Sequence, residues 1–270
     1  MTAFLFGPAL LFCPADRPDR YQKAVERADA VIIDLEDAIR AEARQDARRA
    51  IVASELDPGR VVVRINPLDS ADCEADLDAV ARTAYRTIMV PKAESAERIA
   101  ALTADLAVIA LCETARGVVE AERIAALDNV IALMWGAEDL VASLGGSSSR
   151  TADGGYRDVA RSARTRVLIA AGAFGKAAID AVHLDIADLE GLAAEAVDAV
   201  AIGFAATACI HPDQVEVVRH AYRPDLATVE WARAMLAAAE QHGGVFTFDN
   251  QMIDEPLLRH ARAVIARSER

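Results

Sequence analysis

Short apolar runs rich in β-branched residues alternate along the chain with longer stretches in which apolar residues recur every three or four positions. Most of the runs are continuously hydrophobic, which is typical of strands buried on both faces. The eight runs are ALLFCPA from residue 9, AVIIDLED from 30, RVVVRIN from 60, RTIMVPKAE from 86, AVIALCET from 107, VIALMWGAED from 130, AAIDAVHL from 177 and AIGFAATACIHP from 201.

The stretches that separate the runs have the apolar spacing of helices. They cover residues 18–28, 40–54, 71–84, 95–103, 117–127, 156–174 and 188–199, and a further helix at 212–222 follows the last run. Eight strand–helix units predict an α/β fold, a (β/α)8 TIM barrel over residues 1–222. A doubly wound sheet is the alternative, but it calls for a glycine-rich turn after the first strand, where this chain has CPADRPDR.

The tail, residues 223–270, is predicted to form a helical extension beyond the barrel. Residues 225–242 place Val229, Ala232, Leu236 and Ala239 at helical spacing, Gly243-Gly244 follows, and a last helix is expected at 257–268. Because this tail is long for a cap, we interpret it as an arm that contributes to the site of a neighbouring subunit. The segment GGSSSR at 145–150 is expected to be a loop after the sixth strand.

Composition narrows the class of protein. The 270 residues are 53% hydrophobic, which excludes intrinsic disorder, and 29 basic against 42 acidic residues give a net charge of −13. That charge argues against a nucleic-acid partner bound through phosphates. The apolar start lacks a basic segment and a cleavage site, no later stretch is long enough to span a membrane, and the four cysteines form no CxxC pair. We therefore expect a cytoplasmic protein with reduced thiols and no membrane partner.

Polar side chains follow each apolar run, at the end of the strand where active sites of such barrels lie. The strand-end residues are Asp16, Arg17, Arg20 and Lys23; Asp34, Glu36 and Asp37; Arg64 and Asn66; Lys92 and Glu94; Glu113 and Arg116; Glu138 and Asp139; His183 and Asp185; and His211.

Glu113 and Asp139 stand one strand apart, which suits Mg²⁺, an ion that binds one or two carboxylates and keeps several waters. Alternatively, each carboxylate caps the following helix or pairs with Lys92 or Arg116. Arg64 is suited to grip a substrate carboxylate, or to pair with the DLED carboxylates of 34–37, and the two interpretations are compatible. The DLED group itself, with Glu36 and Asp37, is expected to hold metal-bound water.

His183 and His211 are acid–base candidates, although a single strand-end histidine is more often a hydrogen-bonded structural residue. Met134 and Trp135 are expected to fill the barrel. The sequence contains no GxSxG, HExxH or GxxxxGK[ST] motif.

Eight short motifs, in this order, resemble the citrate lyase β-subunit-like branch of the HpcH/HpaI aldolase/citrate lyase superfamily. They are CPADRPDR, VIIDLEDA, VVVRIN, VPKAES, ETARG, GAEDL, IHPDQ and QMID. MWGAEDLVASLGGSSSR and ADGGYRDVAR are similar to the stand-alone actinobacterial members, which are not components of a citrate lyase complex.

The resemblance implies a trimeric barrel that uses Mg²⁺ on acyl-CoA thioesters. Matched motif by motif, Glu113 and Asp139 would be metal ligands, Glu113 also contacting substrate, and Arg64 would bind the carboxylate or keto acid. Asp254, from QMID, would be the acid–base residue and reach a neighbouring subunit's site. Arg20 and Lys23 would lie near the CoA phosphates.

We therefore expect a lyase that splits a 3-hydroxy-acyl-CoA, of the malyl-, citramalyl- or 3-hydroxy-3-methylglutaryl-CoA type, into acetyl-CoA and a keto acid. Two alternatives stay open. One is malate-synthase-like or malyl-CoA thioesterase activity on the same scaffold, and the other is a subunit of a citryl-thioester lyase complex.

Overall fold

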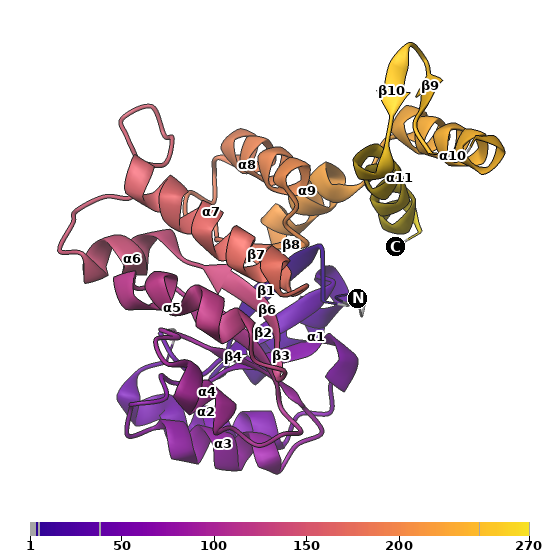
Figure 1. Ribbon diagram of the computed structural model, residues 1–270. Coiled ribbons are helices and arrows are strands. Elements are labelled where there is room, and N and C mark those ends of the chain that lie inside the picture. The colour runs from indigo at the N-terminus through magenta and orange to yellow at the C-terminus, as the bar shows by residue number, and fades with distance from the viewer. Residues whose placement is uncertain (1–3, 5, 38, 243, 270) are drawn as a thin grey trace. The chain divides into compact units, whose positions relative to one another are not determined.

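The computed structural model describes residues 4, 6–37, 39–242 and 244–269, so parts of the apolar start, Ala38 of the VIIDLEDA motif and Gly243 lie outside the described residues. In this part of the chain, eight parallel strands close into a barrel in sequence order, with helices around it (Figure 1). The predicted TIM barrel is confirmed. The strands are β1 (Ala9–Pro14), β2 (Ala30–Asp34), β3 (Val61–Arg64), β4 (Thr87–Val90), β5 (Ala107–Cys112), β6 (Val130–Trp135), β7 (Ala177–Asp180) and β8 (Ala206–Cys209).

The helices of the barrel largely follow the predicted segments. They are α1 (Pro18–Arg27), α2 (Arg44–Val52), α3 (Cys73–Ala81), α4 (Ala96–Ala100), α5 (Ala115–Ala125), α6 (Ala137–Ser143), α7 (Asp158–Ala173), α8 (Leu189–Ile202) and α9 (Pro212–Tyr222). Two short 3-10 turns, η1 (Ala41–Ala43) and η2 (Pro58–Arg60), precede α2 and β3.

Two predicted boundaries are wrong. The eighth strand does not begin at residue 201, because α8 continues to Ile202 and ends at Gly203, whose φ of 111° is readily adopted only by glycine. The sixth strand does not end in Glu138 and Asp139, because β6 stops at Trp135 and both acids lie in the first turn of α6. That short helix follows the strand after a single residue, so the apolar run continues from one into the other.

The barrel interior is filled by apolar side chains of very different size. Large side chains from several strands pack against small ones from β6 and β8. The residues are Leu10, Ile32, Val62, Met89, Ile109, Leu111, Ala132, Met134, Ile179, Ala206 and Ala208, each at most 3% exposed. Met134 is thus barrel filling, as predicted. This packed interior gives the strand ends a fixed frame.

A buried ionic network fixes the segment that follows β3. Asp76 of α3 is fully buried, and its carboxylate accepts hydrogen bonds from Arg48 Nε and from the backbone and side-chain nitrogens of Asn66, each at 2.7 Å. Asn66 also donates to the carbonyl of Leu35 at 3.0 Å. Since Leu35 stands between Asp34 and Glu36, the network ties the ends of β2 and β3 together.

The chain divides into two compact units, residues 1–218 and 219–270. The second contains α10 (Leu226–Gln241), an antiparallel hairpin of β9 (Phe246–Phe248) and β10 (Gln251–Ile253), and α11 (Glu255–Ser268). Both predicted helices are present, whereas the hairpin was not predicted. Its turn residues Asp249 and Asn250 have positive φ angles of 47° and 61°, as the tight turns that join hairpin strands require.

The C-terminal unit has its own apolar core. Residues of both helices and of the hairpin contribute to it, namely Val229, Ala232, Met235, Phe246, Ile253, Ala261 and Val264. The four cysteines of the chain are all buried in the barrel unit, and no disulfide joins them. Within the described ranges, no helix combines the length and apolarity that crossing a membrane requires.

We expect Asp76→Ala to lower the free energy of unfolding by about 3–5 kcal/mol, since it leaves the buried guanidinium of Arg48 and the amide of Asn66 without their acceptor. Urea denaturation followed by circular dichroism measures the change. Asp46→Ala is the matched control, because Asp46 forms an exposed ion pair with Arg49 on α2, and its loss should cost no more than about 0.5 kcal/mol. Equal effects of the two substitutions would contradict the role of the buried network.

Candidate active site

Arg64 is fixed at the end of β3 by Asp34, its register partner at the end of β2. Nε and Nη2 of Arg64 donate to the two oxygens of Asp34 at 2.6 and 2.7 Å, and the guanidinium lies 4.9 Å from the centre of the Phe12 ring. Burial alone would lower the pKa of Arg64, but the hydrogen bonds and charge of Asp34 hold it above its ordinary value. The guanidinium therefore stays ionised and in place.

The third nitrogen of Arg64 faces the two remaining acids of the DLED segment. Nη1 lies 3.1 Å from Glu36 Oε2 and 3.6 Å from Asp37 Oδ2, so the ion pairs predicted as an alternative for Arg64 are present. The ammonium of Lys92 bonds the other oxygen of Glu36. Burial raises the pKa of the Glu36 carboxyl, and Arg64 and Lys92 oppose that shift. Arg64 and Lys92 together hold the DLED segment at the ends of β2 and β3.

Lys92 follows β4 and connects the DLED segment with the next pair of acids. Its φ of 46° lies in the left-handed region, and its backbone N–H donates to Glu113 Oε1 at 3.1 Å. Its ammonium nitrogen lies 3.9 Å from Asp139 Oδ1. One residue therefore contacts acids that follow β2, β5 and β6.

Glu113 is only 4% exposed, at the end of β5. Burial raises the pKa of its carboxyl to about 8, and the negative charges of Asp139 and Glu36 add to the rise. Gly136, which precedes α6, lies against it: a Cβ at this position would come within 2.9 Å of Glu113 Cβ. A glycine is thus required where β6 passes into the helix that carries Asp139.

The donor set fits a hard divalent cation. Glu113 and Asp139 offer only carboxylate oxygens, and within the described ranges no cluster of three His, Cys, Asp or Glu side chains is placed to enclose a metal. This suits Mg²⁺, which uses one or two carboxylates and completes its octahedron with water and substrate oxygens. Asp139 lies inside α6, not at its N-cap, and Arg116 forms no described ion pair with either acid. Capping by Asp139 and pairing with Arg116 are therefore wrong, whereas the contacts with Lys92 are present.

Arg64, Glu113 and Asp139 line a cavity of about 420 Å³ at the carboxyl ends of the strands. We call this cavity the barrel mouth. Its polar side is formed by Asp34, Asp37, Arg64, Glu113 and Asp139, and its apolar side includes Phe12, Leu111, Met134, Trp135, Val182 and Ile210. Trp135 is held by a hydrogen bond of 2.6 Å from its indole N–H to Asp180. The cavity thus combines a charged wall with an apolar one.

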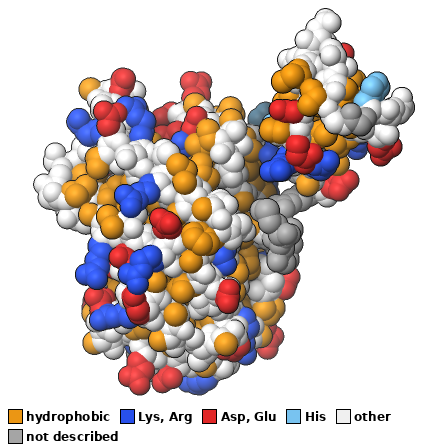
Figure 2. Space-filling view, viewed as in Figure 1, with side chains coloured by type: hydrophobic (Ala, Val, Ile, Leu, Met, Phe, Trp, Pro, Cys, Tyr) orange, Lys and Arg blue, Asp and Glu red, His pale blue; other side chains and the backbone are white. Residues whose placement is uncertain are grey.

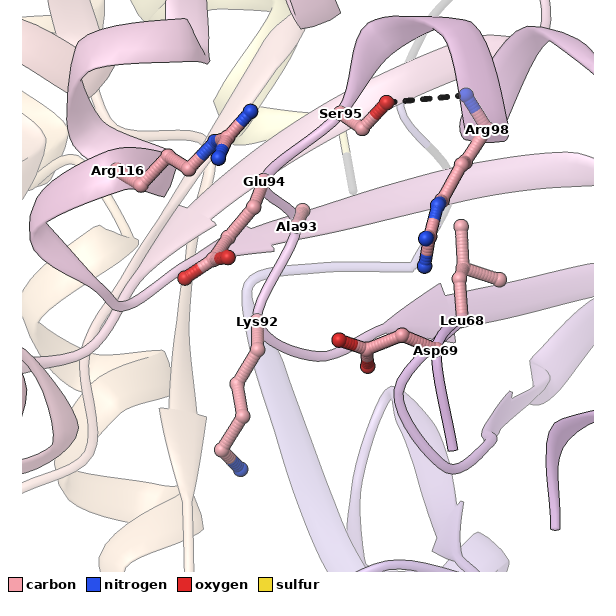
Figure 3. Close-up of a pocket in the computed structure, with 8 residues that line it drawn as sticks. All are labelled: Leu68, Asp69, Lys92, Ala93, Glu94, Ser95, Arg98 and Arg116. Carbon is pink, nitrogen blue, oxygen red and sulfur yellow. Dashed lines mark hydrogen bonds between the residues drawn. The ribbon is translucent and has the colours of Figure 1, made fainter. Parts of the chain in front are cut away.

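A second, smaller cavity of about 210 Å³ adjoins Lys92 on the side of α4 and α5 (Figure 3). Arg98, Arg116, Glu94 and Asp69 line it, and the Lys92 side chain extends away from Glu94, Ser95 and Arg116. Lys92 therefore lines this cavity, while its ammonium contacts the acids near the barrel mouth.

Two further predicted site residues of the barrel unit, Arg20 and Lys23, do not line the barrel mouth. Arg20 and Lys23 are exposed on α1, and neither forms an ion pair in the part of the chain that the structure describes. Figure 2 shows basic and acidic side chains interspersed on one face of the barrel unit, so the net charge is not expressed there as a continuous acidic surface. Asp254 belongs to the C-terminal unit, where its side chain caps α11 through the N–H of Leu257 at 3.4 Å.

The two candidate histidines have structural surroundings. His183 is 5% exposed, and its Nδ1 lies 2.9 Å from Glu195 of α8. His211 lies 3.5 Å from Asp213, next to the start of α9. Neither lines the barrel mouth. Sequence reasoning assigned no role to Gly136, and it named Lys92 and the DLED segment with Asp34 only as alternative ion-pair partners, although the motifs GAEDL, VPKAES and VIIDLEDA contain these residues.

Comparison with known proteins places this site in a family. The model of the HpcH/HpaI aldolase/citrate lyase family matches residues 9–212, which span the barrel. The citrate lyase subunit beta-like protein of Mycobacterium tuberculosis is 56% identical over 97% of this chain and 96% of its own. The human mitochondrial citramalyl-CoA lyase is 30% identical over 95% of this chain and 84% of its own.

A solved structure agrees with these matches. The crystal structure of CitE from Mycobacterium tuberculosis in complex with magnesium, acetoacetate and coenzyme A superposes with a TM-score of 0.92, at 56% identity and with 98% of each chain covered. The barrel, the strand-end acids and these matches lead to one conclusion: the chain belongs to the HpcH/HpaI aldolase/citrate lyase family.

Proposed function

We propose that this protein is a Mg²⁺-dependent carbon–carbon lyase that cleaves a 3-hydroxy-acyl-CoA carrying a distal carboxylate into acetyl-CoA and a keto acid. Malyl-, citramalyl- and 3-hydroxy-3-methylglutaryl-CoA are the candidate substrates. The observation that carries the proposal is the pair of carboxylates, Glu113 and Asp139, set beside the fixed guanidinium of Arg64 in one cavity. Such a substrate needs carboxylate oxygens that hold a metal ion and a positively charged side chain that binds its distal carboxylate.

The substrate would lie across the barrel mouth. Arg64 binds the distal carboxylate or the keto acid through Nη1, since its other two donors stay on Asp34. Arg20 and Lys23, which have no described ion pair, supply positive charge for the CoA phosphates against the net charge of −13. The apolar wall with Met134 and Trp135 receives the carbon chain.

Bound by Glu113 and Asp139, Mg²⁺ would act as a Lewis acid toward the 3-hydroxyl oxygen and the carbonyl that forms from it. The 3-hydroxyl loses its proton to the DLED group, Glu36 or Asp37, as the carbon–carbon bond breaks and the bonding electrons pass to the acetyl-CoA enolate. Asp37 is the better placed of the two, because it is exposed and lines the barrel mouth, whereas Glu36 Oε2 is buried 3.1 Å from Arg64 Nη1. Asp254, from the arm of a neighbouring subunit in a trimer, then protonates the enolate carbon.

The relatives support this reaction class. The name of the human relative specifies citramalyl-CoA cleavage, and the Mycobacterium tuberculosis structure holds magnesium, coenzyme A and acetoacetate, a keto acid. Acetoacetate is the keto acid that 3-hydroxy-3-methylglutaryl-CoA would release. The three candidate substrates differ by small groups. A single methylene or methyl group changes specificity by about 10–200-fold, so small differences between the pockets of relatives can change the preferred acyl group.

We expect the wild-type enzyme with Mg²⁺ to convert at least one of the three candidate thioesters to acetyl-CoA and its keto acid, measured by mass spectrometry. Glu113→Gln and Asp139→Asn should lower turnover at least about 10³-fold, because each removes a metal ligand. Glu97→Gln, which changes an exposed acid on α4, is the matched control and should be fully active.

Full activity in EDTA would rule out the metal-dependent reaction. Free CoA together with an intact hydroxy acid would show thioesterase or malate-synthase-like activity instead. Activity that appears only with an acyl-carrier protein would favour the citryl-thioester lyase subunit.

We expect Glu113→Gln to be more stable than the wild type at pH 9 without Mg²⁺. The pKa of Glu113 in the folded protein, about 8, exceeds its ordinary value of 4.5, so the folded state loses stability as the pH rises from about 5 to 9 and the carboxyl ionises. Glutamine avoids that loss, which we place at about 1–3 kcal/mol. Thermal unfolding of both proteins at pH 5 and pH 9 measures this loss. If the stability difference between Glu113→Gln and the wild type were the same at the two pH values, the raised pKa would be contradicted.

We expect Asp254→Asn and Glu113→Gln to be inactive separately and to regain activity when the two variants are co-expressed. If the arm acts in a neighbouring subunit's site, an Asp254→Asn subunit supplies an intact barrel and a Glu113→Gln subunit an intact arm. Random mixing in a ring of heterologous contacts then restores up to about a quarter of the sites. No recovery in isolated mixed oligomers would place Asp254 in its own subunit's site.

A further inference from the structure

Lys92 adopts a backbone conformation that is unusual for its residue type. The described non-glycine residues with positive φ are Lys92, Asp249 and Asn250. Asp249 and Asn250 form the hairpin turn, where this conformation is ordinary. Lys92 instead lies beside the barrel mouth, and a φ of 46° is uncommon for residues other than glycine, asparagine and aspartate. Strain of this kind persists where surrounding contacts fix it, often at a functional site.

This conformation lets one residue make two different contacts. The backbone N–H points at Glu113 Oε1, at 3.1 Å, while the ammonium reaches Glu36 and lies 4.0 Å from Asp37 and 3.9 Å from Asp139. In Figure 3 the side chain of Lys92 points in the direction opposite to Arg116 and Ser95. Lys92 thus lines the cavity that Arg98 and Arg116 also line, while its ammonium contacts Glu36 and lies near Asp37 and Asp139.

The position of the ammonium brings it close to the proposed metal. Mg²⁺ binds carboxylate oxygens at about 2.1 Å. An ion on Asp139 Oδ1, which is 3.9 Å from Lys92 Nζ, would therefore lie no more than about 6 Å from the ammonium. At that separation a divalent and a monovalent cation repel each other appreciably even with the full screening of water.

We propose that Lys92 is a positioning residue that sets the affinity of the site for Mg²⁺. Its ammonium is a built-in countercharge for Glu36, Asp37 and Asp139, and it keeps Glu36 turned toward Lys92 and Arg64 and away from the metal ligands. The site therefore binds free Mg²⁺ weakly, and substrate oxygens complete the binding. This inference rests on the proposed metal site at Glu113 and Asp139.

The test is isothermal titration of Mg²⁺ into the full-length protein without substrate, at pH 9.5, where the carboxyl groups are ionised. Lys92→Met keeps the length of the side chain and removes its charge, and it should bind Mg²⁺ at least about tenfold more tightly than the wild type. Lys92→Gln, a second neutral variant, should behave in the same way. Lys92→Arg keeps the charge and should stay within about threefold of the wild type.

Lys176→Met is the matched control for net charge. Lys176 precedes β7 and bonds the carbonyl of Leu127, so it lies at the opposite ends of the strands from the site, and its loss should leave the affinity unchanged. Neutral variants of Lys92 that bind Mg²⁺ equally or more weakly, while circular dichroism shows them folded, would overturn the inference. A wild-type protein that does not bind Mg²⁺ at all, with or without substrate, would instead overturn the proposed function.

Discussion

The paired hydrogen bonds between Arg64 and Asp34 are the interaction on which the active-site region depends. Five carboxyl groups, those of Asp34, Glu36, Asp37, Glu113 and Asp139, gather above an apolar barrel interior that offers no compensating charge. Arg64 and Lys92 supply two positive charges, so the cluster has a formal charge of 2 − 5 = −3 when all five carboxyl groups are ionised. A divalent ion reduces this charge to −1, so electrostatics favour its binding although Lys92 opposes it.

Separate networks fix the two sides of the barrel mouth. On one side, Asp76 and Asn66 hold the carbonyl of Leu35 and hence the DLED segment. On the other, Arg164 of α7 bonds Asp180 at 2.8 Å, and Asp180 holds the indole of Trp135. The two networks thus support the segment that carries Glu36 and Asp37 and the end of β6, after which α6 with Asp139 begins. Rigid support of this kind is what precise placement of a substrate requires.

The sequence predicts the barrel well because strands buried on both faces leave continuous apolar runs, as in AVIID of β2 and VIALMW of β6. It predicts α6 poorly, since the apolar run passes into that helix after one glycine. The hairpin at Asp249-Asn250 had a usable signal in its turn residues. Strand-end placement predicts Arg64, Glu113 and Asp139 as site residues, and the structure brings all three to one cavity, although Asp139 lies in α6. The role proposed for Lys92 depends on a backbone angle and on contacts between residues 56 positions apart, which no local pattern specifies.

The central claim is that Glu113 and Asp139 form a divalent-cation site beside Arg64. Anomalous diffraction from crystals soaked in Mn²⁺, which shares the preference of Mg²⁺ for oxygen ligands, tests it most directly. We expect one strong anomalous peak within about 2.3 Å of an oxygen from each of the two carboxylates, and its loss in Glu113→Gln crystals. A peak at Glu36 and Asp37 without Glu113, or none in the barrel mouth, would contradict it.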